Sequence, residues 1–269
     1  MIQQFEWLHT GYCTAHEAVG MRGGRWKEVT FPANFGLLMH ETEGPVLFDC
    51  GYSNRFFEAT AQFPYRIYRY VTPVFIRPEL SPLELLRTRG IAPESVRHIL
   101  ISHFHGDHVC ALRDFPNARF YCHQKAMDQF RQVSGWSAVK RGILPDLFPD
   151  DFEDRCVLLG DFNALPDPDF GQKWDVFGDG SIEMPYLPGH GCGQMGARFK
   201  VQGETVFLLA DAAWFMAAIT ENRLPHPIVR LFFDDWTAYR DTLTRLQRYH
   251  EQFPAVRMIP THCNLSHYP

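Results

Sequence analysis

The sequence has 269 residues, of which 45% are hydrophobic, and its 26 basic and 31 acidic side chains give a formal net charge of −5. This length and composition are typical of a globular protein with a large core, and they exclude disordered and fibrous proteins. The acidic balance and the lack of a Lys/Arg-rich run argue against a nucleic-acid binder, because such a surface repels a polyanion. We therefore expect no nucleic-acid partner.

The seven cysteines are widely spaced and form no C-x-x-C pair. Such a set predicts neither a disulfide framework nor a cysteine zinc site, and it fits a reducing compartment. The first residues lack the basic flank and apolar stretch of a signal peptide, and no apolar run approaches the roughly 20 residues of a membrane helix. We therefore expect a cytoplasmic protein without a membrane partner.

Short apolar runs that end in turn residues predict strands in both halves of the chain. In chain order, the expected strands are residues 35–40, 46–48, 98–102, 118–122, 182–187, 205–209 and 256–259. Helices are expected at residues 81–90, 124–133 and about 234–250. The first of them begins with Ser81-Pro-Leu-Glu84, a capping sequence with proline at the first helical position.

Residues of about 134–180 differ from the rest because they contain many Pro, Asp and Phe residues and show little periodicity. Long loops without regular structure are uncommon in compact domains unless they have a function. We interpret this segment as an insertion in a single domain of residues 1–269, serving either as a lid or as the interface of a homodimer.

Histidines and aspartates follow four of the expected strands at the point where each strand ends. In sheets packed with helices, side chains at one end of neighbouring strands converge on a common crevice. We therefore predict that seven side chains from distant parts of the chain meet at one site: His103, His105, Asp107, His108, His190, Asp211 and His262.

The types of these donors and their spacing predict a site for two divalent metal ions. Alternation puts His103 and His105 on one side, whereas Gly106 permits a tight bend that turns Asp107 and His108 toward a second point. Imidazole nitrogen and carboxylate oxygen are normal donors for zinc, and paired ions can hold a shared hydroxide while they polarise a carbonyl. We expect zinc, although the same donors accept iron, manganese and cobalt.

The pattern resembles the signature of the metallo-β-lactamase fold hydrolases, with His-x-His-x-Asp-His at residues 103–108 followed by Gly-His, Asp and a final His. The resemblance implies an αββα sandwich, an α/β fold in which two mixed sheets lie face to face with helices outside. It also implies a dinuclear site at one edge, with the first ion held by His103, His105 and His190, the second by Asp107, His108 and His262, and Asp211 as the bridge. Asp49, in the Asp-Cys-Gly turn after the expected hairpin, would orient a ligand loop.

The complete set of seven ligands is similar to that of N-acyl homoserine lactonases, glyoxalase II thioesterases and tRNA-processing nucleases. The net charge disfavours a nuclease, and the short stretch after Asp211 disfavours the glyoxalase II type, which carries a substantial C-terminal helical region. The sequence around Asn34-Phe-Gly and Glu43-Gly-Pro is similar to the lactonase group. We therefore favour a lactonase with a small-molecule substrate, and the alternatives are a thioesterase, a phosphodiesterase and a non-catalytic member that binds a metal or ligand.

The resemblance implies that a metal-bridging hydroxide attacks the lactone carbonyl and that the catalytic Asp107 or Asp211 handles the proton. Many lactonases carry a substrate-binding tyrosine shortly after the bridging aspartate, but this chain has Trp214 there. Tyr186 or Tyr239 could take its place.

Four residues are candidates for the apolar lining of the substrate pocket, with ordinary core packing as the equal alternative: Met21, Trp26, Trp214 and Phe215. Three cysteines lie within two residues of ligand histidines: Cys110, Cys192 and Cys263. We expect these thiols to be packing residues and not ligands.

Overall fold

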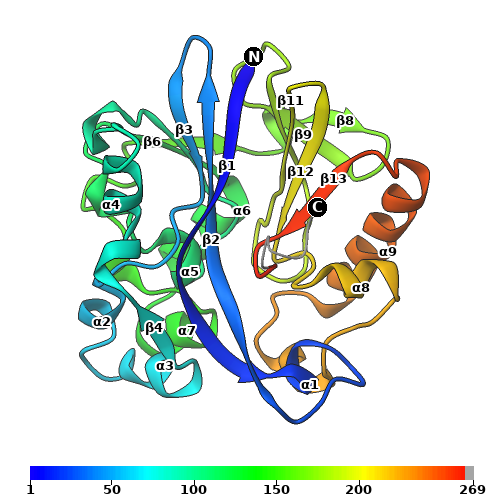
Figure 1. Ribbon diagram of the computed structural model, residues 1–269. Helices are drawn as coiled ribbons and strands as arrows, with labels where there is room; N and C mark the ends of the chain where they lie inside the picture. The colour runs from blue at the N-terminus through cyan, green and yellow to red at the C-terminus, as the bar shows by residue number, and fades with distance from the viewer. Residues whose placement is uncertain (264–269) are drawn as a thin grey trace.

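The computed structural model describes residues 1–263. Two β-sheets pack face to face, and helices cover their outer faces (Figure 1). The first sheet consists, in spatial order, of β4 (Val74–Ile76), β1 (Ile2–His16), β2 (Glu28–His40), β3 (Gly44–Phe48), β5 (His98–Leu100), β6 (Arg119–His123) and β7 (Cys156–Leu159). The second consists of β13 (Arg257–Pro260), β12 (Glu204–Ala210), β11 (Ala197–Val201), β10 (Ile182–Pro185), β9 (Gly171–Asp175) and β8 (Leu165–Asp167).

Both sheets are mixed, as the resemblance implied. In the first sheet β3, β5, β6 and β7 run parallel, while β1 is antiparallel to β2 and β4. In the second sheet β12 and β13 are parallel and the other neighbours are antiparallel. The expected αββα sandwich is therefore confirmed.

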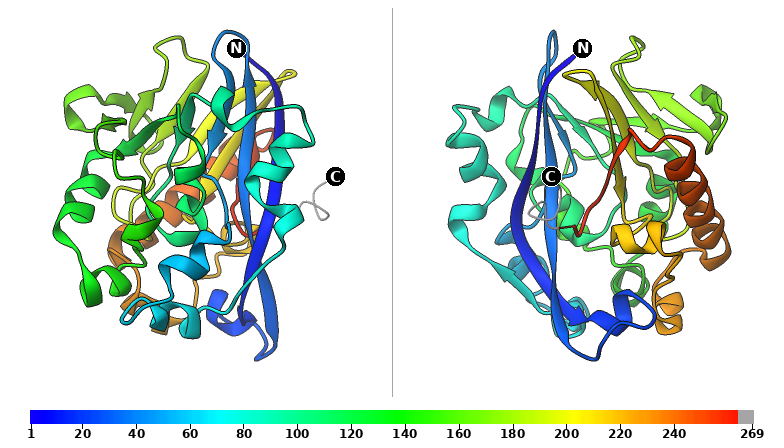
Figure 2. Two further views of the ribbon diagram at one scale, coloured as in Figure 1. Left: turned by 90° about the vertical axis from the view of Figure 1, so that its left-hand side faces the viewer. Right: turned by 45° about the vertical axis from the view of Figure 1, so that its right-hand side comes forward.

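Helices lie on the two outer faces, and Figure 2 shows this layering from two further sides. α1 (Glu17–Gly20) is different, because it lies at the end of the hairpin formed by β1 and β2. The other helices are α2 (Arg55–Ala59), α3 (Arg66–Val71), α4 (Pro82–Arg87), α5 (Gly106–Val109), α6 (Gln124–Gln132), α7 (Gly135–Lys140), α8 (Met216–Thr220) and α9 (Trp236–Gln252). Short 3-10 segments are η1 (Pro78–Leu80), η2 (Pro93–Ser95), η3 (Leu112–Asp114), η4 (Pro145–Leu147), η5 (Asp161–Asn163) and η6 (Pro227–Leu231). No helix within residues 1–263 combines the length and apolar character needed to cross a bilayer.

Successive hydrophobic residues of the central strands face different layers of the sandwich. Leu37 lies in the core between the first sheet and its helices, whereas Leu38 lies in the core between the sheets. In β12, Leu208 faces the other sheet and Leu209 packs in the core beneath α9. Because side chains alternate between the faces of a strand, unbroken apolar runs predict a sheet that is covered on both sides.

Neither β1 nor β11 is among the strands expected from the sequence. β11 does alternate apolar and polar residues, but over only five positions, whereas polar residues interrupt β1, which also contains two register shifts, between Ile2 and Gln4 and between His9 and Gly11. Such bulges break the two-residue period that identifies a strand. The strand predicted to start at residue 35 in fact begins at Glu28, where it pairs with the end of β1.

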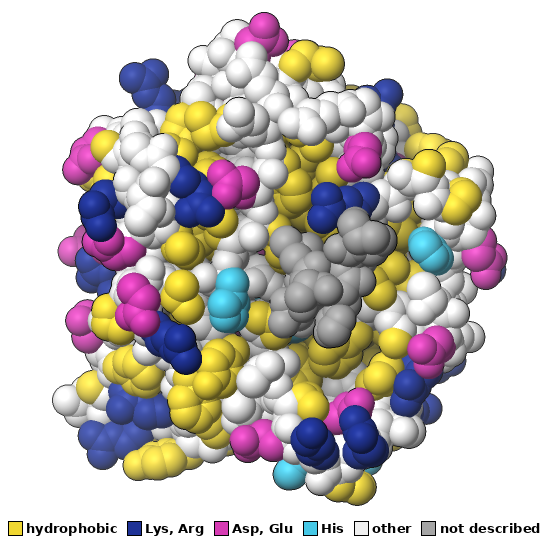
Figure 3. All heavy atoms as spheres, in the orientation of Figure 1, with side chains coloured by type: hydrophobic (Ala, Val, Ile, Leu, Met, Phe, Trp, Pro, Cys, Tyr) yellow, Lys and Arg dark blue, Asp and Glu magenta, His cyan; other side chains and the backbone are white. Residues whose placement is uncertain are grey.

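Residues of about 134–180 contain α7, β7, β8 and β9. The segment therefore contributes strands to both sheets and is not an insertion of irregular structure. β8 (Leu-Pro-Asp) and β9 (Gly-Gln-Lys-Trp-Asp) contain no apolar run that would mark a strand, whereas β7 (Cys-Val-Leu-Leu) is a short apolar run within the segment. Basic, acidic and hydrophobic side chains are interspersed over the face shown in Figure 3.

Candidate metal centre

Four strands end near the same edge of the sandwich, and each is followed by predicted ligand residues. His103 and His105 lie in the loop after β5, Asp107 and His108 lie in α5, which follows it, and the loops after β10, β12 and β13 carry His190, Asp211 and His262. All seven side chains are buried except that of His105, which is half-buried. Tertiary structure thus gathers donors from four separate parts of the chain.

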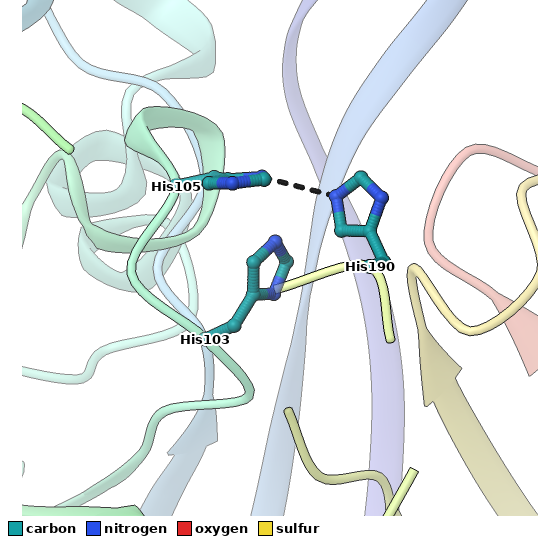
Figure 4. Close-up of side chains that lie close together, drawn as sticks. All are labelled: His103, His105 and His190. Atoms are coloured by element: carbon teal, nitrogen blue, oxygen red, sulfur yellow. Dashed lines mark hydrogen bonds between the residues drawn. The ribbon is translucent and has the colours of Figure 1, made fainter. Parts of the chain in front are cut away.

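The seven donors form three overlapping groups, and within each group the ligand atoms lie within 4.8 Å of one another. The groups are His103, His105 and His190; His103, His108 and Asp211; and Asp107, His108 and His262. Figure 4 shows the first group, whose imidazole rings point toward one another, with His105 Nδ1 3.0 Å from His190 Nε2. The shared members join the groups into one cluster.

Asp211 occupies the middle of this cluster. Its Oδ1 lies 3.4 Å from His108 Nε2, and its Oδ2 lies 3.2 Å from both His190 Nε2 and His262 Nε2. One carboxylate therefore reaches histidines of different groups through its two oxygens.

The residues fit a metal site because several buried donor atoms have no hydrogen-bond partner. Among the described residues these atoms include His103 Nε2, His108 Nε2 and Asp211 Oδ1, which belong to one donor group. A buried polar atom without a partner costs about 1–3 kcal/mol. Cations at the cluster would satisfy these lone pairs and offset that cost.

Burial prepares three of the histidines as neutral donors. It lowers the pKa of His190 to about 3, and it also lowers the pKa values of His103 and His105. A neutral imidazole keeps the nitrogen lone pair that a metal ion requires. The imidazole rings of these three residues are therefore neutral at neutral pH.

Carboxylates give the other half of the cluster its negative charge. Burial opposes ionisation of Asp107, but the nearby His108 and His262 lower its pKa to about 2. Burial also opposes ionisation of Asp211, yet His262, His190 and His108 hold its pKa well below the usual value. Two ionised carboxylates among histidines make a donor set suited to divalent cations.

Asp49 fixes the orientation of His108. Its Oδ2 lies 2.7 Å from His108 Nδ1 and accepts a hydrogen bond of 2.8 Å from the Ser102 hydroxyl, while its Oδ1 accepts one of 2.7 Å from the Ser102 amide. Because Nδ1 of His108 donates to Asp49, Nε2 is the ring atom that faces the cluster. Pro32 O plays the same part for His262, at 2.9 Å from Nδ1. Burial opposes protonation of the His108 ring, but Asp107, Asp49 and Asp211 raise its pKa well above the usual value, so a cation bound at Nε2 would displace a proton.

The backbone on both sides of the site takes left-handed conformations at strand ends. Asp49 has φ 59° directly after β3, and Ala210 has φ 48° directly before Asp211. Non-glycine residues seldom adopt such angles, and they concentrate where function requires a particular side-chain direction.

Two glycines allow the loops to pass close to the ligand rings. A Cβ at Gly191 would lie 2.6 Å from Cδ2 of His103. A Cβ at Gly142 would lie 2.6 Å from Cδ2 of His105, and this glycine also has φ +69°. Any side chain at either position would push a ligand ring out of place.

A cavity of about 470 Å³ opens onto the cluster. His105, Asp107, His190, Asp211 and His262 contribute to its lining. Its other walls are mainly apolar and come from β1, α3, α7, η6 and the loop after β12; they include Ile67, Val71, Trp136, Val139, Trp214, Ile228, Val229, Phe232 and Phe233.

Of the four residues predicted for the pocket lining, Trp214 lines the cavity and the other three do not. Met21 is half-buried outside the cavity, and Trp26 is 70% exposed with its ring 6.1 Å from that of His226. Phe215 packs behind a lining residue, with its ring centre 5.2 Å from that of Phe31.

The tyrosines at the cavity differ from those predicted to replace the usual one. Tyr186 stacks on His123 at 4.8 Å, and Tyr239 is buried against Trp236; neither lines the cavity. The lining contains Tyr52 and Tyr68 instead. Tyr68 lies in α3, a six-residue helix too short to show periodicity in the sequence.

Cysteines are absent from the donor groups found within residues 1–263. Cys110 is buried, with its sulfur 3.3 Å from Ser53 O, and burial raises the pKa of its thiol to about 11. The Cys192 sulfur lies 3.4 Å from Lys125 O. Both thiols thus make contacts within the loops.

Fold and donor cluster together define a metal-dependent hydrolase class, and comparisons with known proteins agree. The sequence profile of the Metallo-beta-lactamase superfamily matches residues 30–253, so the chain belongs to this superfamily. The expected hydrolase of this fold is thereby confirmed.

Relatives within the superfamily include bacterial lactonases. The N-acyl homoserine lactonase AttM of Rhizobium johnstonii is 27% identical over 217 residues, which cover 79% of this chain and 76% of the relative. The N-acyl homoserine lactonase AiiB of Agrobacterium fabrum is 22% identical over 223 residues, covering 80% of this chain and 74% of the relative.

Solved structures show the same fold. An N-acyl homoserine lactone hydrolase with N-hexanoyl-L-homoserine at its catalytic metal centre matches with a TM-score of 0.74 at 17% identity, covering 97% of this chain and 94% of that one. AidC, a dizinc quorum-quenching lactonase, matches with a TM-score of 0.64 at 15% identity, covering 97% and 88%.

Proposed function

We propose that the protein is a dinuclear metal-dependent lactonase that hydrolyses N-acyl homoserine lactones or closely related cyclic esters. The observation that carries this proposal is a cluster of seven histidine and aspartate donors, five of which line a cavity whose other walls are mainly apolar. The names of the relatives support it, since AttM and AiiB are N-acyl homoserine lactonases.

Two divalent ions fit this donor set, with His103, His105 and His190 holding one, Asp107, His108 and His262 the other, and Asp211 between them. Bound ions supply Lewis acidity and activate water for attack at neutral pH. Zinc is the first choice for nitrogen and oxygen donors, followed by iron, manganese and cobalt.

We assign the proton transfer of ring opening to Asp107. It lines the cavity, and it is ionised because neighbouring histidines lower its pKa to about 2. Its carboxylate can accept a proton from the attacking water and return it to the ring oxygen after the acyl–oxygen bond breaks. Atoms balance, since the lactone and one water give one hydroxy acid.

The apolar wall determines which acyl groups bind. Val71 of α3, Val139 of α7 and Val229 of η6 line the cavity together with aromatic side chains. Burying an acyl chain against this wall contributes about 0.8 kcal/mol for each methylene group that leaves water. A hydrophobic acyl chain therefore suits the cavity better than a phosphodiester or another highly charged substrate.

Metal analysis and substrate profiling test the proposal. The purified protein is expected to contain two equivalents of transition metal and to hydrolyse N-hexanoyl-homoserine lactone, with acid release followed at constant pH. A thioester and bis(4-nitrophenyl) phosphate complete the panel, because they represent the thioesterase and phosphodiesterase alternatives.

Variants link the activity to the cluster. His105→Ala and Asp211→Asn should abolish hydrolysis while the circular dichroism spectrum stays unchanged, and the exposed residues His16→Ala and Asp241→Asn serve as matched controls. Hydrolysis of only the thioester or the phosphodiester would reject the lactonase. A protein that binds no metal would reject the dinuclear site.

A further inference from the structure

The indole of Trp214 is already engaged by the donor cluster. Its Nε1 donates a hydrogen bond of 3.0 Å to Oδ2 of Asp211. The ring packs edge-on between Phe31, at 5.9 Å, and Phe233, at 5.6 Å, so aromatic contacts hold it in this orientation. An indole has a single N–H donor. Trp214 therefore has no second hydrogen bond to offer to a substrate.

Tyr68 brings a different hydroxyl to the same end of the cavity. This residue of α3 lines the cavity together with Asp107 and Asp211. Its phenolic oxygen faces the backbone N–H of Gly106, the residue between two predicted ligands. The edge-to-face contact with Phe56, with ring centres 5.7 Å apart, restricts the ring. The phenol therefore has a defined place beside the ligand loop.

The phenol of Tyr68 has a hydrogen to donate, because a tyrosine hydroxyl is protonated at neutral pH. As the Gly106 N–H occupies an acceptor position on the oxygen, the phenolic hydrogen remains for another partner.

Tyr52, the other tyrosine of the lining, is placed differently. It is only 1% exposed, and its hydroxyl interacts with the thiol of Cys13. Its ring packs on Phe56 from the side of the core, at 5.3 Å. Among the tyrosines of residues 1–263, Tyr68 thus combines access to the cavity with an available donor.

We propose that Tyr68 donates the hydrogen bond that holds the scissile carbonyl oxygen of the substrate beside the donor cluster, while Trp214 is a positioning residue for Asp211. This inference rests on the proposed hydrolysis of an ester. In this arrangement Tyr68 of α3 orients the substrate, and Trp214 of the loop after β12 orients the central carboxylate. A hydrogen bond to the carbonyl strengthens as negative charge develops on its oxygen, so the phenol would assist the attack as well as binding.

The test compares Tyr68→Phe with Tyr70→Phe. Tyr70 lies in the same helix and is 74% exposed, so its variant controls for loss of a phenol from α3. Two substrates are used: N-hexanoyl-homoserine lactone, which carries an amide, and γ-decalactone, which does not. Tyr68→Phe should lower kcat/KM about 10- to 100-fold on both, with metal content and melting temperature unchanged, because the lost bond is to the carbonyl that the two share.

Several results would overturn the inference. One is a change of less than threefold for Tyr68→Phe; another is a loss confined to the amide-containing substrate, which would place the phenol on the amide. Trp214→Phe should weaken metal retention against a chelator, and if it instead raised KM with normal metal retention, Trp214 would be the substrate donor. If the wild type hydrolyses a thioester but no lactone, the lactonase proposal fails while Tyr68→Phe is still tested on the thioester carbonyl. Hydrolysis of no ester would reject both proposals.

Discussion

Replacing Asp49 with asparagine removes a buried charge without changing the shape of the side chain. The residue is buried and accepts hydrogen bonds from the Ser102 amide, the Ser102 hydroxyl and His108 Nδ1, all between 2.7 and 2.8 Å. Asparagine tolerates the left-handed φ of 59° found here, so the turn after β3 should survive. The variant thus isolates the charge that polarises His108.

The expected effect follows from the single bond to the ligand ring. A hydrogen bond to a charged group contributes about 1.5–3 kcal/mol, and residues that orient metal ligands affect metal affinity about 10- to 100-fold. Asp49→Asn should therefore weaken binding of the ion held by His108 by about 1.4–2.7 kcal/mol, since a factor of ten corresponds to about 1.4 kcal/mol. In this variant the other ion should bind more tightly than the ion held by His108, because its three predicted histidines do not contact Asp49.

Competition with a chromophoric chelator measures both affinities. Asp167→Asn is the matched control, because Asp167 is also a buried carboxylate, but it binds Arg198 at 2.7 Å outside the donor groups. The control should destabilise the protein and leave metal affinity unchanged. Equal metal affinity in Asp49→Asn and wild type, or equal weakening in both variants, would refute the reasoning.

Three further predictions test the packing, pH and metal dependence. Gly142→Ala should reduce metal affinity at least tenfold, because the added Cβ would collide with the ring of His105. The control is Gly90→Ala, since Gly90 has a similar φ of +72° but open space around it. This control should lower the free energy of unfolding by only about 1 kcal/mol and leave metal affinity unchanged. Burial lowers the pKa of His123 from 6.5 to about 4. As the pH falls, this imidazole is therefore protonated in the unfolded chain before it is protonated in the folded protein, and the free energy of unfolding decreases between about pH 6.5 and 4. The control variant is His123→Asn, because asparagine can keep the hydrogen bond to the Lys125 amide. Between about pH 6.5 and 4 the free energy of unfolding, measured in urea, should fall by up to about 3 kcal/mol less in this variant than in the wild type. Equal losses in the two proteins would contradict the assignment. A chelator should lower the melting temperature by several degrees, reversibly on adding zinc, because metals that bind only the folded state stabilise it; no change would argue against tight binding.

The sequence by itself determined the order of the main strands and the identity of the donors. Both can be read from short stretches of sequence. An apolar run predicts a strand that is buried on two faces, and the polar residues directly after it lie at the end of that strand, where donors can meet. The same logic fails for β1, where register shifts break the period, and for β8 and β9, which contain no apolar run.

Tertiary structure alone decided which side chains line the cavity beside the donor cluster. The sequence contains Trp214 and Tyr68, but not the fact that one indole hydrogen points at Asp211 or that α3 turns a phenol toward Gly106. These contacts join positions far apart in the chain. Their existence depends on how helices and loops pack around the sheet edge, because the direction of a side chain is fixed by its neighbours in space and not by the residues beside it in sequence.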